Sequence, residues 1–157
     1  MTRRFILLGA NERGNSVIEL GLVAPIIATF LIGMVDIGRA VAERLNLEQA
    51  AQRSVERLMQ GQETSASFAN LAADAAASAG VLVTAVTVTP RLECNGAIAA
   101  TGAAYYSSSC AAGQTKARYV NVSVNKDFTP LFGTRFFPGA NANGTVTLTG
   151  EAGIRVQ

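Results

Sequence analysis

The 157-residue sequence has no histidine and few charged side chains, and these shortages exclude several classes of protein. It holds no cluster of metal-ligating residues, no glycine-rich phosphate loop, and no plausible catalytic pair of acids outside its first 60 residues. Its basic residues are scattered, whereas a nucleic-acid site gathers them into a patch. We therefore expect neither an enzyme nor a protein that binds a metal, a cofactor or nucleic acid.

Charge is scarcest in one hydrophobic run near the N-terminus. From Val17 to Val35 the only ionisable residue is Glu19, and the next is Asp36. A helix of that length, at about 1.5 Å per residue, reaches roughly 28 Å, close to the thickness of a hydrocarbon core. The run therefore predicts one membrane span. A buried core helix is the alternative, but the rest of the chain offers little to wrap it.

The residues around the run predict its orientation. Arg3, Arg4 and Arg13 precede it against the single acid Glu12, and such an excess of arginine favours a cytoplasmic N-terminus. A cleaved secretory signal is the competing interpretation, because residues 40–42 read Ala-Val-Ala and resemble a cleavage box. The run is longer than the apolar core of a usual signal. We expect a single anchor, with the C-terminal part outside the cytoplasm.

Cysteine is rare, and its two occurrences agree with that location. Cys94 and Cys110 flank a segment rich in alanine, serine and glycine. In an oxidising compartment a disulfide between them would contribute about 3 kcal/mol through loop-closure entropy. Two free thiols are the alternative, and the spacing matches no zinc-binding pattern.

Helical periodicity continues beyond the apolar run. Hydrophobic residues recur mostly every three or four positions, at Ile37, Val41, Leu45, Ala51, Val55, Leu58 and Met59. We therefore expect one helix from about Ser16 to Gln60. Residues 15–35 of it should cross the membrane, and residues 36–60 should form an amphipathic continuation that packs on the rest of the protein.

Proline and glycine mark special points within this helix. Pro25 predicts a kink or local unwinding, because proline removes a backbone hydrogen bond. Gly21, Gly33 and Gly38 are positions where another helix can approach closely in a membrane.

Residues 61–157 predict a small extracytoplasmic α+β domain. A second helix, capped by Thr64 or Ser65 and stopped by Gly80, is followed by strand-like alternation. Three strands are expected, over 81–89, 119–128 and 145–156. The first of them should end at Thr89, because Pro90 breaks the run. One-sided strands need a cover, so the two helices should pack on a small antiparallel sheet.

One segment of this domain is rich in phenylalanine. It contains four of the seven phenylalanines, Phe128, Phe132, Phe136 and Phe137. We expect the Phe128–Phe137 loop to cover the edge of the sheet, and a partner-binding tip is the alternative.

Together these features resemble a known family. A basic leader that ends in glycine, a glutamate five residues later and an apolar helix that continues into an αβ domain are typical of type IV pilins and pseudopilins. More narrowly, GNSVIELGLVAPIIATFLIGMVDIGRAVAERLNLEQAAQRSVER resembles the TadE/TadG-like pseudopilins of tight-adherence (Flp) pilus systems. The matching residues are Glu19, Leu22, Val23, Pro25, Asp36, Gly38, Arg39, Ala50, Ala51 and Arg53.

The resemblance implies how the protein is processed and used. Residues 1–14 would be a prepilin leader, which a prepilin peptidase removes by cutting between Gly14 and Asn15. Glycine suits such a site, because without a side chain the backbone can extend into a protease cleft. The mature protein would be a minor pilin in the bacterial inner membrane that primes, caps or joins an adhesive Tad-type pilus.

The same resemblance names the partners. They would be other pilin subunits, the prepilin peptidase, the inner-membrane assembly platform and membrane lipid. The competing hypothesis is an unprocessed, single-pass membrane anchor that carries an extracytoplasmic binding module.

Three charged residues at the ends of the run have two interpretations each. Glu19 either stays hydrated at the cytoplasmic interface or, as the family implies, pairs with the α-amine of a neighbouring subunit. Such pairing would offset the roughly 2.5–3.5 kcal/mol that an acid deep in a bilayer costs, and only at one axial stagger. Asp36 and Arg39 either mark the outer membrane interface or set the registry between helices.

Overall fold

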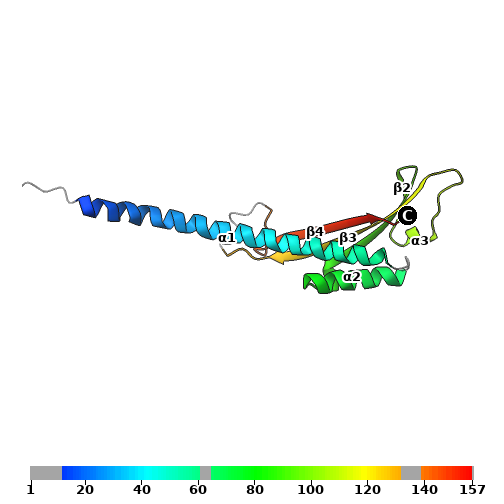
Figure 1. Cartoon of the computed structure of the whole chain (residues 1–157), viewed down its shortest axis with the longest axis horizontal. Helices are drawn as coiled ribbons and strands as arrows, with labels where there is room; N and C mark the ends of the chain where they lie inside the picture. Colours follow the sequence, from blue (N-terminus) through cyan, green and yellow to red (C-terminus); the bar gives the residue numbers. More distant parts are fainter. Residues whose placement is uncertain (1–11, 61–64, 132–138, 157) are drawn as a thin grey trace, which may run out of the picture.

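The computed structural model describes residues 12–60, 65–131 and 139–156, and it combines one long helix with a small sheet (Figure 1). Helix α1 (Glu12–Leu58) has 47 residues, about 70 Å at the usual helical rise. Its N-terminal half extends away from the other elements, and its C-terminal half lies along them (Figure 1). The single helix expected from the sequence is confirmed, beginning four residues earlier and ending two residues earlier than Ser16 and Gln60.

Pro25 does not interrupt this helix. The local unwinding that proline predicts is absent, because α1 stays helical on both sides of it. The hydroxyl of Thr29 donates a hydrogen bond to the Pro25 carbonyl at 2.7 Å. Pro25 removes one backbone hydrogen bond of the many along α1. The turns on either side of it are helical and hold the conformation.

The C-terminal half of α1 packs on the domain through one face. Five apolar residues of this face are buried, namely Leu47, Ala50, Ala51, Val55 and Leu58. The expectation that Ile37, Val41 and Leu45 share this face is wrong, because their side chains are 58%, 53% and 50% exposed. Residues spaced four apart are rotated by about 40° around the helix axis at each step, so the series Ile37, Val41 and Leu45 turns away from the sheet. Asp36, Ala40 and Glu43 take its place on the packed side.

The sheet has four antiparallel strands, one more than expected. They are β1 (Val86–Cys94), β2 (Ala97–Thr101), β3 (Lys116–Phe128) and β4 (Val146–Arg155). Their order across the sheet is β2-β1-β3-β4. The additional strand, β2, is five residues long, rich in alanine and mostly exposed, so it carries no alternation that a sequence pattern can reveal. The α+β class is confirmed.

The first expected strand is shifted along the chain. Residues 83–85 form a short 3₁₀ helix, η1 (Val83–Ala85), and β1 continues through Pro90. The expected break is wrong because Pro90 lies just beyond the end of β2. The Pro90 carbonyl accepts a bond from Gly102 N–H at 3.1 Å on the β2 side, so the missing proline N–H also faces that side. The proline therefore costs at most one bond at the end of the ladder, and the Gly102 carbonyl there accepts the N–H of Tyr105 instead.

Both helices cover the same face of the sheet. Helix α2 (Ser65–Ala79) runs beside the C-terminal half of α1 (Figure 1) and ends before Gly80, whose φ of +63° suits glycine. The central strand β3 presents its fully buried Val120, Val122 and Val124 to the helices. This alternation was readable from the sequence. The candidate cap Thr64 lies outside the described residues.

At one point the helix and the sheet approach to backbone contact. A Cβ added at Gly150 of β4 would clash with the α1 backbone at Leu47 and Glu48. Glycine is therefore required here, so that strand and helix can meet without a side chain between them.

A disulfide ties the far end of the domain. Cys94, the last residue of β1, is bonded to Cys110, which follows the short helix α3 (Ala104–Ser107). Their Cα atoms are 5.6 Å apart. The predicted bridge is confirmed, and it closes the loop that contains β2 and α3.

Candidate functional site

The N-terminal half of α1 is an unpacked apolar rod. Within the described residues it is the one helix long and apolar enough to cross a membrane, with a mean hydropathy of 2.2 over its most apolar stretch. None of that stretch is buried in the protein. Large side chains such as Val17, Leu22 and Phe30 are 68–69% exposed. A core helix of a soluble domain would be covered, so this surface needs lipid or another helix.

The processing and assembly candidates lie on this rod. The peptide bond between Gly14 and Asn15 lies within the first turn of α1, and Glu19 follows on an exposed part of the helix. The three helix-packing glycines also face open space. A Cβ added at Gly21, Gly33 or Gly38 would meet no atom within 4 Å.

The rod joins the domain at Asp36. This side chain is only 1% exposed, yet it is a carboxylate. Leu131 N–H donates to both of its oxygens, at N···O distances of 3.0 and 2.8 Å, and Arg39 Nη1 donates to one of them at 3.3 Å. These bonds compensate for the loss of water around a buried acid. Asp36 therefore holds the chain after β3 against α1.

Two further residues of α1 continue this contact toward the sheet. The Arg39 guanidinium lies 5.3 Å from the centre of the Phe128 ring, and Glu43 forms an ion pair with Lys126. Positions 36, 39 and 43 recur at helical spacing, which places them on one face. We call the six residues Asp36, Arg39, Glu43, Lys126, Phe128 and Leu131 the junction seam.

The junction seam brings together the predicted pair and adds residues that sequence reasoning missed. Asp36 and Arg39 do contact each other, as their spacing suggests. Glu43, Lys126 and Leu131 were not among the candidates, since nothing in a single sequence links residues about 90 positions apart. Of the Phe128–Phe137 loop, Phe128 is buried in the seam. Phe132, Phe136 and Phe137 lie outside the described residues.

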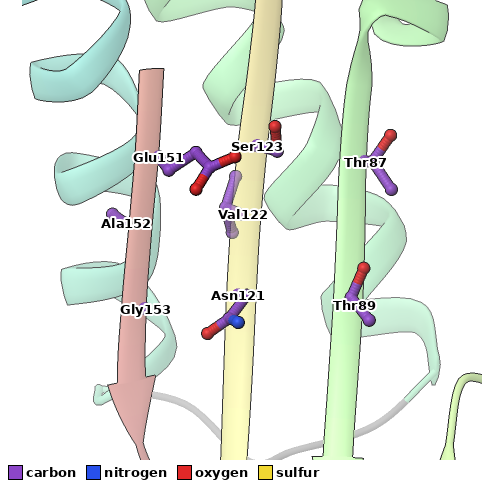
Figure 2. A pocket seen from close by; sticks show the side chains of 8 residues that line it. All are labelled: Thr87, Thr89, Asn121, Val122, Ser123, Glu151, Ala152 and Gly153. Carbon is purple, nitrogen blue, oxygen red and sulfur yellow. The ribbon is translucent and has the colours of Figure 1, made fainter. Parts of the chain in front are cut away.

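The outer face of the sheet, opposite the helices, is polar. A shallow hollow of about 370 Å³ lies across β1, β3 and β4 (Figure 2). Strand register aligns its lining residues in two rows, Thr89–Asn121–Gly153 and Thr87–Ser123–Glu151. The Asn121 side chain occupies the space that a Cβ at Gly153 would need. Hydroxyls, an amide and one carboxylate can bind a polar ligand, but they form no catalytic pair of acids.

Metal ligands are not gathered in the described parts of the chain. Within residues 12–60, 65–131 and 139–156, no group of three histidine, cysteine, aspartate or glutamate side chains is placed to hold an ion.

The fold and the site define a class of protein, in which one apolar helix projects from an α+β domain and packs on it through its C-terminal half. Residues 14–55 match the model of a family described as TadE-like protein. The match begins at Gly14 and includes Glu19, Pro25 and the helical half of the junction seam. This chain therefore carries a TadE-like segment, of the family associated with Tad pilus systems, and the resemblance found in the sequence is confirmed over that range. No curated protein and no solved structure matches the chain.

Proposed function

We propose that this protein is a minor pilin, or pseudopilin, that helps to assemble a Tad-type pilus by priming, capping or joining it. The observation that carries the proposal is the apolar stripe formed by Ile37, Val41 and Leu45. These residues follow the predicted span and are 50–58% exposed. A helix that served only as a lipid anchor would need no apolar surface beyond the bilayer.

A second helix is the natural cover for this stripe. Burying a fully exposed side chain of this kind is worth about 1.5–3 kcal/mol, and these side chains, already about half covered, would each contribute roughly half of that to an association. The stripe continues the exposed surface of the rod, where Gly21, Gly33 and Gly38 leave room for close approach. The proposed partners are therefore other pilin subunits, which contact α1 along most of its exposed length, and the inner-membrane assembly platform that adds them.

The proposed location is the bacterial inner membrane, with a single span over residues 15–35. Three arginines precede the span, which supports a cytoplasmic N-terminus. The Cys94–Cys110 disulfide supports an oxidising compartment for residues 61–157. In this arrangement the domain reaches the cell surface when the subunit enters a pilus, where it would contribute to adhesion.

A prepilin peptidase is proposed to remove residues 1–14 before assembly. The family match begins at Gly14, the residue on which such a cut would end the leader. Helix ends fray, so the bond between Gly14 and Asn15 is easier to present in extended form than any bond farther along α1. The cut removes three arginines and one glutamate, so the side-chain total changes from 13 basic and 11 acidic to 10 and 10.

Glu19 is the proposed assembly residue on the membrane half. It is exposed and is the one charged side chain between Val17 and Val35. The Glu19 carboxylate could pair with the free α-amine at Asn15 of a neighbouring subunit. This pairing would offset the free-energy cost of the carboxylate in lipid, but at only one axial stagger between the two helices. Glu19→Ala should insert and be cleaved but enter pili poorly, and normal recovery of this variant from sheared pili would contradict the role.

A second function is favoured by one feature, the polar hollow on the outer face of the sheet (Figure 2). A permanently anchored binding module would use it for a polar ligand and would keep its leader. Neither proposal gives the protein a catalytic step, a metal or a cofactor.

The state of the N-terminus separates the two. Intact-mass spectrometry should be run on the protein from cells with and without an active prepilin peptidase. The assembly proposal predicts a mature chain that starts at Asn15 in the first strain and a full-length chain in the second. A full-length chain in both strains would support the anchored module instead.

A further inference from the structure

The end of the domain nearest the membrane carries an exposed leucine. After β3 the chain alternates, since Phe128 and Pro130 are buried while Thr129 and Leu131 are exposed. Leu131 is 64% exposed, although its own backbone N–H is held by Asp36. The backbone of this residue is thus fixed to the protein, and its apolar side chain is left outside.

The contact with Asp36 sets the height of Leu131 along α1. Asp36 is the first residue after the predicted span, which ends at Val35, so its carboxylate lies at the boundary of the hydrocarbon core. Leu131 N is within 3.0 Å of that carboxylate. The leucine therefore lies beside the headgroups, within one helical turn of the core, about 5.4 Å.

The surface beneath Leu131 belongs to the same lipid-facing rod. Ile32 lies one turn before Asp36 on the same side of α1 and is 38% exposed. Before a second subunit is present, an apolar side chain at this level continues the surface of the span that faces lipid. This continuity identifies the occupant as the lipid interface.

We propose that Leu131 docks the extracytoplasmic domain onto the outer surface of the bilayer before assembly, with Asp36 as the residue that positions it. The inference rests on the membrane anchor of the proposed function and adds a second, peripheral contact with lipid. Because the domain is already packed on α1, this second contact would limit the tilt and rotation of the whole subunit in the membrane. The exposed stripe of Ile37, Val41 and Leu45 is then presented in one direction.

Tryptophan fluorescence tests the docking directly, because the chain has no tryptophan. The full chain carrying Leu131→Trp should be reconstituted in phosphatidylcholine vesicles, with and without bromine near the headgroup end of the acyl chains. We expect roughly twofold quenching, because interfacial apolar groups lie about 5–10 Å deep, within reach of such bromines.

Leu82→Trp is the matched control. Leu82 is 77% exposed. It lies beside Lys126, since both residues line a second pocket that is separate from the polar hollow of Figure 2. Lys126 pairs with Glu43, which is two helical turns, about 10 Å, farther from the span than Asp36. Leu82→Trp should therefore stay almost unquenched. Equal quenching of the two variants, or none in either, would overturn the docking.

A third variant tests the positioning. Leu131→Trp combined with Asp36→Ala should lose most of the quenching, because the backbone N–H is released. Unchanged quenching would overturn the role of Asp36. Flotation of the vesicles separates this inference from the anchor on which it rests. A chain that floats with an unquenched tryptophan contradicts the docking alone, and a chain that does not float contradicts both.

Discussion

The carboxylate of Asp36 accepts the backbone N–H of Leu131 with both oxygens, across 95 positions of sequence. This contact joins the last turn of the apolar rod to the chain that leaves the central strand. With the Glu43–Lys126 ion pair and the Arg39–Phe128 contact, it fixes the angle at which the domain meets its helix. The residue that follows the apolar run in the sequence is thus also the residue that fastens the domain to the helix.

Removing this acceptor should weaken the domain. We predict that Asp36→Ala lowers the free energy of unfolding by about 1–3 kcal/mol, because the part-buried N–H of Leu131 loses its acceptor. Asp36→Asn keeps one acceptor oxygen and should cost less. Urea unfolding of the full chain in detergent, followed by circular dichroism, measures both. Glu48→Ala is the control, since it removes an exposed pair with Arg44 and should change stability by less than about 0.5 kcal/mol.

Gly150→Ala should be destabilising for a different reason. The new Cβ meets the backbone of α1, which cannot move aside as a side chain can, and overpacking of this kind costs about 1–3 kcal/mol. Gly153→Ala is the matched variant on the same strand, where the obstacle is the Asn121 side chain. It should cost clearly less in the same assay. Equal losses would contradict the account of how β4 packs on the helix.

The exposed stripe should matter for assembly and not for folding. Val41→Asn changes a side chain that is 53% exposed, so the free energy of unfolding should stay within about 0.5 kcal/mol. Recovery of the variant in sheared pili should fall several-fold, because the polar side chain weakens packing against a neighbouring helix. Asn46→Ala is the control, because Asn46 is exposed but lies about 140° around the helix axis from Val41, and it should leave recovery unchanged. Val41→Asn pili with normal content would contradict the role of the stripe.

Much of the fold was readable from local patterns. The apolar run and its continuation predicted α1 to within a few residues at each end. The alternation of Val120, Val122 and Val124 predicted the central strand and its buried face. These predictions succeed because each depends on a period of 2 or 3.6 that persists over many residues.

The errors came where tertiary contacts override a local signal. Pro90 breaks a strand only if its missing N–H faces a partner, and that depends on where β2 stops. The stripe at Ile37, Val41 and Leu45 has the spacing of a core face, but the sheet binds the adjacent face, which the buried Asp36 marks.

The candidate site was predictable only in part. Cys94 and Cys110 are the only two cysteines, so their pairing was accessible. Asp36 and Arg39 stood out because they end an apolar run. The partners of that pair, Leu131 and Phe128, are brought to it by the topology of the sheet, and a single sequence holds no record of such pairing.

The measurement that tests the central claim most directly is the composition of the pilus itself. Surface pili should be sheared from cells that express the Tad system and this protein, and peptides of the chain should be sought by mass spectrometry. We predict the chain in the pilus fraction with Asn15 as its N-terminal residue. Its absence from pili, with a full-length chain left in the membrane, would contradict the account.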